Sequence, residues 1–456
     1  MDPLDRYLAD KQAEHLEDLL AFLRMESVST NPAKAPDVAA CAAWVAAELE
    51  RAGLKATLHP TAGHPIVYGE WLGAPGAPTL LLYGHYDVQP PEPLELWRNP
   101  PFSPTLEEGA RVVARGATDD KGQVLAHVKA LQALMELHGR LPVNVKVVIE
   151  GEEEIGSPNL PPFLEEHRER LRADAVLVSD SSMWAPGRPA LMVSLRGLAY
   201  VEIEVTGPSH DLHSGLFGGG VANPLLGLSK VLAALHDDEG RVMLPGFYDK
   251  VRPLSADERA EMASLGHDEA AELASLGLAE GAGEAGYSFY ERTSARPTLD
   301  ANGMWGGYTG PGAKTVLPSK AYAKVSCRLV PDQCPEEVSA AFEAFVNEHL
   351  PAGLSAEVRA HHGAVPVMVP RDIAAFGAAE RALEHVWGVP PVYTRGGGSI
   401  PIIATFQEVL GVGAVLMGLG LQDDRLHSPN EKFELSCYYQ GIRAAAWTLI
   451  EMSKQA

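Results

Sequence analysis

Basic residues, cysteines and long apolar runs are all scarce in this sequence of 456 residues. Lys and Arg number 37 against 60 Asp and Glu, which gives a formal net charge of −23 at pH 7. Nucleic-acid binding needs a basic face toward the phosphates, so we expect no nucleic-acid partner. No apolar run approaches the roughly 18 residues of a membrane span, and the richest stretch, 409–421, is broken by glycines. We therefore expect no membrane partner.

The cysteines and the amino terminus both bear on the cellular compartment. Only four cysteines are present, and their positions show no metal-ligand spacing: Cys41, Cys327, Cys334 and Cys437. So few cysteines in a long chain indicate reduced thiols. Residues 1–25 form an acid-bearing amphipathic pattern without the basic and then apolar order of a signal peptide. The sequence therefore predicts a cytoplasmic protein.

The motif GHYDVQP sets His85 and Asp87 two residues apart, directly after the apolar run 79–83. Residues i and i+2 of a strand share a face, so both side chains would point into one site. Open α/β sheets bind ligands beyond the carboxyl ends of their strands. Taken alone, such a triplet is also compatible with a surface coincidence, so distant segments have to supply matching groups.

Three acidic segments supply groups that could act together with His85 and Asp87. Asp119 and Asp120 precede an amphipathic stretch, 123–138, and so stand at a helix start, where the helix dipole favours anions. Glu150 to Glu154 include four acids and follow an apolar strand at 143–149. Asp180 follows a short apolar strand at 174–179. Any one of these acids could equally be a helix cap or part of a solvated charge run.

A fifth segment, LHSPNE, places His427 after an apolar strand at 412–417 and a loop. A lone histidine there would be an ordinary loop residue. Together with the other segments it completes a set of two histidines and three or four carboxylates. Zinc and manganese accept such a set, so the joint pattern predicts a metal site.

In these motifs the chain resembles the co-catalytic di-metal peptidases, the family of carnosine dipeptidase, cytosolic non-specific dipeptidase, aminoacylase and succinyl-diaminopimelate desuccinylase. The resemblance covers nearly the whole chain and is strongest to the dipeptidase branch. Eight motifs carry it, in this order: GHYDVQP, RGATDDKG, EGEEEIGS, DLHSGLFGG, GAKTVLPSK, RLVP, GGGSIP and HSPNE.

The resemblance implies two divalent ions in each subunit, zinc in the first place and manganese as the alternative. Asp119 would bridge the ions, with the remaining ligands divided between the two sites: His85 and Asp180 at one, Glu154 and His427 at the other. A metal-bridged hydroxide would attack the peptide bond. The family also implies a cis peptide bond between Asp119 and Asp120.

Two further acids have roles in the reaction. Glu153, unligated and adjacent to the ligand Glu154, would be the general base and acid that moves a proton from water to the leaving amine. Asp87 would hold His85 by accepting its second ring N–H, as carboxylates near metal-binding histidines usually do.

Substrate binding is assigned to the glycine-rich turn 396–401 and to an arginine. The turn ends in a proline suited to a helix start, which offers free N–H groups to an anion, although a plain helix entry would look the same. The resemblance implies that Gly398 and Ser399 bind the substrate carboxylate together with Arg328. Because Arg328 lies in an apolar strand pattern it needs a partner, and a structural acid is the competing explanation.

Three further residues are assigned through the resemblance. His213 would hydrogen-bond the developing oxyanion, and His213 and Thr315 would reach the active site of the neighbouring subunit of a homodimer. His362 matches a substrate-contacting histidine, in a flanking sequence that departs from the family pattern. A solvent-facing loop residue is the alternative for His213.

Asp180 bears on the substrate class. Family members that act on peptides with a free amino terminus tend to have aspartate at this position, whereas deacylases tend to have glutamate. We therefore expect a dipeptidase that acts on dipeptides or short peptides. An N-acyl amino acid deacylase with the same metals is the alternative, and a non-catalytic metal-stabilised binding protein is a third hypothesis, which intact Glu153 and Asp87 argue against.

The organisation predicts an α/β catalytic domain interrupted by an α+β lid and dimerisation domain. Residues 1–195 alternate helices, at 6–23, 38–51 and 123–138, with apolar strands. A strictly alternating strand at 200–205 opens the second domain, 196–365, which includes an acidic helical excursion at 255–286. Residues 366–456 return to the catalytic domain. We expect a mixed, mostly parallel sheet flanked by helices.

Overall fold

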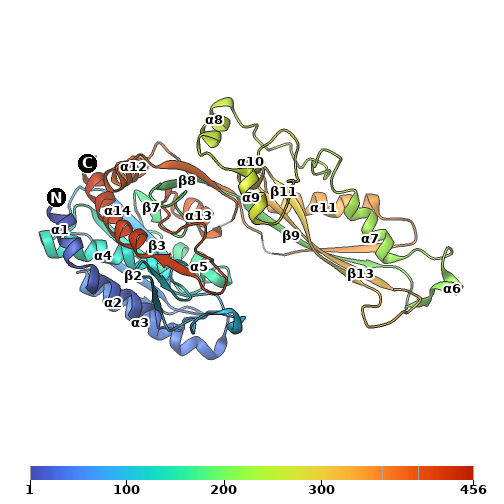
Figure 1. The fold of residues 1–456 in the computed structure, drawn as a ribbon, viewed down its shortest axis with the longest axis horizontal. Helices are drawn as coiled ribbons and strands as arrows, with labels where there is room; N and C mark the ends of the chain where they lie inside the picture. Colours follow the sequence, from blue (N-terminus) through green and yellow to red (C-terminus); the bar gives the residue numbers. More distant parts are fainter. Residues whose placement is uncertain (1, 362, 399, 455–456) are drawn as a thin grey trace. The chain divides into compact units, whose positions relative to one another are not determined.

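The computed structural model describes residues 2–361, 363–398 and 400–454 (Figure 1). The chain divides into two compact units. Unit 1 comprises residues 1–193, 369–394 and 402–456, and unit 2 comprises residues 194–368 and 395–401. The glycine-rich turn therefore groups with unit 2, although the sequence around it belongs to unit 1.

Unit 1 is an α/β unit. Its principal elements are α1 (Pro3–Asp10), α2 (Gln12–Leu23), α3 (Ala35–Arg51), β1 (Lys55–His59), β2 (Ile66–Trp71), β3 (Thr79–His85), β4 (Thr105–Glu107), β5 (Arg111–Val113), α4 (Lys121–His138), β6 (Asn144–Glu150), α5 (Leu160–Glu166), β7 (Ala175–Val178), α12 (Ala374–Trp387), the π-helical turn η4 (Phe406–Leu410), β17 (Ala414–Leu416), β18 (Lys432–Glu434) and α14 (Leu435–Ser453). The predicted helix at 6–23 is two helices that meet at Lys11. A break of one residue leaves the spacing of the apolar residues unchanged, so the sequence pattern could not predict it.

The main sheet is mixed, which confirms the predicted fold class. Its strand order is β1-β2-β6-β3-β7-β17-β8-β15, with β16 (Val392–Gly396) also pairing with β8 (Ala190–Leu195), and β15 spans Val367–Met368. Parallel pairing joins the four central strands β6, β3, β7 and β17, whereas β1, β2 and β15 pair antiparallel. The carboxyl ends of the four central strands therefore meet at one edge.

Helices cover both faces of these central strands. On one face, a Cβ at Gly84 would lie 2.5 Å from a methyl carbon of Val124, so only glycine lets α4 pack this closely on β3. On the other face, the ring of Tyr83 meets that of Phe406, in η4, at a centroid distance of 5.2 Å. Neighbouring residues of β3 thus contact different helical layers, as the period of a strand requires.

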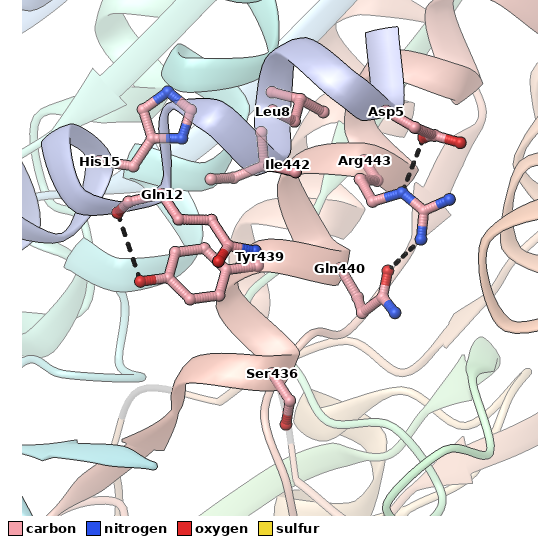
Figure 2. A pocket seen from close by; sticks show the side chains of 10 residues that line it. Asp5, Leu8, Gln12, His15, Ser436, Tyr439, Gln440, Ile442 and Arg443 are labelled. Carbon is pink, nitrogen blue, oxygen red and sulfur yellow. Dashed lines mark hydrogen bonds and ion pairs between the residues drawn. The ribbon is translucent and has the colours of Figure 1, made fainter. Parts of the chain in front are cut away.

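The two ends of the chain meet in unit 1. Arg443 of α14 donates to Asp5 of α1 at 2.8 Å, and the Tyr439 hydroxyl donates to the carbonyl of Gln12 at 3.3 Å (Figure 2). A cavity of about 300 Å³ lies between these helices, and the buried His15 also lines it. The last helix therefore anchors the amino-terminal pair of helices.

Unit 2 is an α+β unit. Its elements are β9 (Gly197–Thr206), β10 (Leu212–His213), α6 (Ser214–Phe217), α7 (Pro224–Ala233), α8 (Ala256–Ser264), α9 (Glu269–Ser275), α10 (Phe289–Ser294), β11 (Thr298–Gly306), β12 (Val316–Leu317), β13 (Lys320–Leu329), α11 (Pro335–His349) and β14 (Ser355–Ala360). An antiparallel sheet in the order β11-β13-β9-β14 carries α7 and α11 on one face (Figure 1).

Strict alternation along β9 and β13 produces the core of unit 2. Every second side chain of β9 is buried and the others are half-buried. The buried set includes Ile203 and Val205, which share a core with Leu228 of α7 and Phe342 of α11. The predicted acidic excursion contains α8 and α9. Among the described residues, no helix combines the length and the apolar character that crossing a bilayer requires.

Candidate metal centre

The candidate site begins where the parallel strands of unit 1 end. His85 is the last residue of β3 and pairs in register with Glu150, the last residue of β6. Tyr83 pairs with Val178 at the end of β7, so Asp180, two residues later, comes to the same edge. The sheet register therefore gathers segments that are up to about a hundred residues apart in the chain, as expected for an α/β fold.

Two groups of side chains lie close enough to hold a metal ion, and both contain Asp119. His85, Asp119 and Asp180 form one group, with their nearest ligand atoms within 4.8 Å of one another. Asp119, Glu154 and His427 form the other by the same measure. Asp119 offers Oδ1 to His85 Nε2 at 3.1 Å and Oδ2 to His427 Nε2 at 3.0 Å. One carboxylate thus faces both histidines, through a different oxygen for each.

The peptide bond between Asp119 and Asp120 is cis, which confirms the expectation from the sequence. The pair stands at the start of α4, where Asp120 is the residue before the first helical position. Asp120 turns back to β3, and its Oδ2 accepts the backbone N–H of His85 at 3.2 Å. Asp119 and His85 are therefore tied together through the neighbouring residue.

The donor set fits a divalent metal ion. His85 is fully buried, yet its Nε2 has no hydrogen-bond partner among the described residues, because its approach to Asp119 does not have hydrogen-bond geometry. A buried ring nitrogen that faces carboxylate oxygens without a hydrogen bond is arranged as a ligand would be. Imidazole nitrogens and carboxylate oxygens are ligands that zinc and manganese both accept.

The histidines carry raised pKa values in this setting. Contacts with Asp119 and then Glu154 raise the pKa of His427 to about 10. Burial alone would lower the pKa of His85, but Asp119 and Asp87 outweigh it and raise that pKa well above the ordinary value. A metal ion at this site would compete with protons for both imidazoles, because only the neutral ring binds a metal.

The carboxylates of the site have opposite shifts. Burial acts to raise the pKa of Asp119, but its contacts with His427 and His85 prevail and hold it below the usual range. Burial and the charge of Asp119 raise the pKa of Asp180 to about 7. Burial, opposed by His85 and reinforced by Asp180, raises the pKa of Glu153 to about 9. The raised pKa values of Asp180 and Glu153 show that several buried carboxylates cannot all be ionised at once without nearby positive charge.

Asp87 is fully buried behind His85 and holds two segments. Its Oδ1 lies 3.4 Å from His85 Nδ1, and its backbone carbonyl lies 3.1 Å from the same nitrogen. Its two carboxylate oxygens also accept the backbone N–H groups of Glu153 and Glu154, each at 3.2 Å. Gln89, from the same motif, donates to Glu154 Oε2 at 2.8 Å. The GHYDVQP motif therefore positions both the histidine and the EGEEEIGS segment.

The residues predicted to contact substrate belong to unit 2. His213 and Val316 pair between β10 and β12, and the backbone N–H of Ser214 donates to the carbonyl of Thr315 at 3.0 Å. His213 and Thr315 are thus neighbours, and both are exposed. Gly398 is also exposed. His362 and Ser399 lie outside the described residues.

Arg328 is half-buried on β13 and forms no ion pair with an acidic side chain in the described part of the chain. The nearby acid Asp300 acts on the neighbouring Arg196, so a structural acid and a substrate carboxylate both stay open as partners of Arg328. Arg328 lies close enough to Arg196 for its charge to matter. Burial and then the charge of Arg328 lower the pKa of Arg196 to about 10.

Several residues that hold the glycine-rich turn and the Asp119 loop were not predicted from the sequence to have a role. Arg196 Nε donates to the carbonyl of Gly397 at 3.0 Å and so holds the glycine-rich turn. Arg115 and Glu431 form a fully buried ion pair at 2.7 Å, below the loop that carries Asp119. Arg115 opens RGATDDKG and Glu431 closes HSPNE, so the signal was present in the motifs, but their pairing was not visible in them.

A model of peptidase family M20/M25/M40 matches residues 81–451. The chain belongs to this family. Its relatives within peptidase family M20/M25/M40 include the Cys-Gly metallodipeptidase dug1 of Schizosaccharomyces pombe, 33% identical over 97% of this chain and 96% of that protein. The solved structure of human carnosine dipeptidase 1 is similar with a TM-score of 0.83 and 30% identity, covering 99% of this chain and 98% of that one. That of the metallo-carboxypeptidase Sso-CP2 from Sulfolobus solfataricus has a TM-score of 0.85 and 34% identity, covering 97% and 99%.

Proposed function

We propose that this member of peptidase family M20/M25/M40 hydrolyses dipeptides and short peptides with a free amino terminus, using two divalent metal ions. The observation that carries the proposal is the double use of Asp119, whose two oxygens face His85 and His427. Asp180 would complete one metal site and Glu154 the other. The dipeptidases among the relatives support the same reaction.

The charge of the site suits hydrolysis. Two divalent ions, three ligand carboxylates and two neutral histidines leave a net charge of about one positive unit. Bound metal ions of this kind polarise a carbonyl and lower the pKa of a bound water to about 7. The ligands Asp119, Asp180 and Glu154 are thus numerous enough to hold the ions and too few to cancel their charge.

Glu153 would transfer the proton. It is half-buried, and its backbone N–H donates to Asp87 Oδ1 at 3.2 Å. It is the neighbour in sequence of the ligand Glu154 and belongs to neither ligand group, so it would lie beside the metal ions without binding them. A carboxylate in this position can accept a proton from the attacking water and deliver it to the leaving amine.

The substrate would be held by unit 2. Arg328 would bind its free carboxylate, together with Gly398, Ser399 and His362. Support comes from the absence of an ion pair between Arg328 and an acidic side chain among the described residues. His213 and Thr315 would complete the site of the neighbouring subunit in a homodimer, which agrees with their adjacent and exposed positions.

Zinc is the first choice of metal, and manganese is the alternative, since mixed histidine and carboxylate sites accept both. The cytoplasm is the proposed location. All four cysteines are free thiols, three of them buried, as in proteins of a reducing compartment.

The test is a substrate panel assayed after reconstitution of the stripped protein with zinc or manganese. Free dipeptides are compared with their carboxyl-terminal amides, with tri- and tetrapeptides, and with N-acetyl and N-succinyl amino acids. We expect dipeptides to be preferred and the amides to be poor substrates, because they lack the charge that Arg328 would bind. Preference for the N-acyl compounds would replace this proposal with the deacylase alternative. Preference for the longer peptides would indicate an activity like that of the carboxypeptidase relative.

A further inference from the structure

Glu431 is a fully buried carboxylate whose two oxygens are occupied by one loop. Oε2 accepts from Arg115 Nη1 at 2.7 Å and from the backbone N–H of Gly116 at 2.9 Å. Oε1 accepts from the backbone N–H groups of Thr118 and Asp119 at 3.0 and 3.1 Å. Four donors from five successive residues converge on one side chain, and the last of them belongs to the proposed bridging aspartate.

The same residue belongs to the loop that carries His427. Its backbone carbonyl accepts the N–H of Ala114 at 3.1 Å, next to the pairing of β18 with β5. Glu431 therefore joins two segments that are more than 300 residues apart in the sequence, and each segment supplies a predicted metal ligand.

The loop before Glu431 needs such an anchor. His427 and Asn430 have φ angles of 57° and 63°, in the left-handed region that non-glycine residues rarely adopt. A conformation of this kind persists only where the surrounding contacts hold it. Asn430 is held on one side, because its Oδ1 accepts the N–H of Arg98 and its Nδ2 donates to the carbonyl of Leu96, both at 2.8 Å. Glu431 holds the other side.

We propose that Glu431 is a positioning residue that sets the spacing between Asp119 and His427 and thereby determines the affinity for both metal ions. The proposal rests on the proposed metal centre. A carboxylate is required, because all four groups that face Glu431 are donors. Substitution by glutamine would turn an NH₂ group toward two of them, so half of the contacts would become repulsive. The Asp119 loop would then be released while every metal ligand stays in the chain.

The experiment measures metal binding by isothermal titration calorimetry, with zinc or manganese alone added to stripped protein. We expect Glu431→Gln to weaken binding about 10–100-fold, the usual effect of removing a group that orients ligands. Glu48→Gln is the matched control, because Glu48 is also buried and ion-paired, at 2.9 Å to Lys129, on α3 rather than in either ligand-bearing loop. It should lower thermal stability and leave metal affinity unchanged.

A second variant, Glu431→Asp, keeps the charge beside Arg115 and withdraws the oxygens by one methylene group. It should bind metal with intermediate affinity, and it provides the answer if Glu431→Gln does not stay folded by circular dichroism. Folded Glu431 variants with metal affinities within twofold of wild type would overturn the role of Glu431. Wild-type protein that binds fewer than two ions would instead contradict the metal centre itself, so the two failures are distinguishable.

Discussion

Asp87, two residues beyond the end of β3, brings its Oδ1 to 3.4 Å from Nδ1 of His85, the last residue of that strand, while His85 Nε2 faces Asp119. The two nitrogens of one ring therefore have different tasks. We expect Asp87→Asn to weaken metal binding by roughly tenfold, because the ring loses its anionic neighbour but keeps the backbone carbonyl of residue 87. Calorimetric titration with zinc checks this. An unchanged affinity would show that the carbonyl alone orients the ring.

Glu153 is the residue assigned to proton transfer. Glu153→Gln should lower kcat by about 10²–10⁴-fold, the usual contribution of a general acid and base, while metal content stays at the wild-type level. Glu152→Gln is the neighbouring control, since Glu152 accepts from Asn159 and from the backbone N–H of His64 at 2.7 and 3.2 Å. Dipeptide hydrolysis by Glu153→Gln within a few-fold of wild type would remove Glu153 from the mechanism.

Removal of the metal ions should lower stability as well as activity. Asp119, Asp180, Glu153 and Glu154 repel one another without cations, and an ion at 100 times its Kd stabilises a folded protein by about 2.7 kcal/mol per site. We expect a lower melting temperature after exhaustive chelation and recovery when zinc or manganese is added back. Chelator already saturated with metal is the control. An unchanged melting temperature would argue against two tightly held ions.

His213 offers a test of the shared active site. His213→Ala and Glu153→Gln should each be nearly inactive alone. After the two variants are co-refolded, random assortment into dimers should restore about a quarter of the wild-type activity, because one site in each heterodimer has both residues intact. Activity that stays at the level of the separate variants would place His213 in the site of its own subunit or outside the site altogether.

The buried His15, which is not part of the metal site, should make the stability of the protein depend on pH. Burial and then the charge of Lys129 lower its pKa to about 4, against 6.5 for the ordinary side chain. Above pH 6.5 the ring is neutral in both the folded and the unfolded protein, so it does not make stability depend on pH there. As the pH falls from 6.5 to 4, the unfolded chain binds a proton that the folded chain does not, so stability falls by on the order of 2–3 kcal/mol.

Urea denaturation of stripped protein at a series of pH values tests this, with His15→Gln as the comparison. The variant should lose less stability than wild type between pH 6.5 and 4. Parallel curves for the two proteins would show that His15 does not titrate as its burial implies.

The segments of the candidate metal site could be located in the sequence because local patterns mark them, and the resemblance to the di-metal peptidases named the ligands within them. His85 and Asp180 follow apolar runs and Asp119 precedes an amphipathic stretch, so these patterns indicated two strand ends and a helix start. The break at Lys11 and the grouping of residues 395–401 with unit 2 were not predictable in this way. They depend on packing against other parts of the chain and leave the local period unchanged.

The sequence by itself determined which side chains stand at strand ends, since the direction of a side chain along a strand or helix is a local property of the backbone. Only the tertiary structure decided which of them meet. Glu431 contacts the backbone of Asp119 across 312 residues, and Arg196 contacts Gly397 across 201. Such contacts arise from the register of paired strands and the closure of long loops, and no local pattern of residues encodes them.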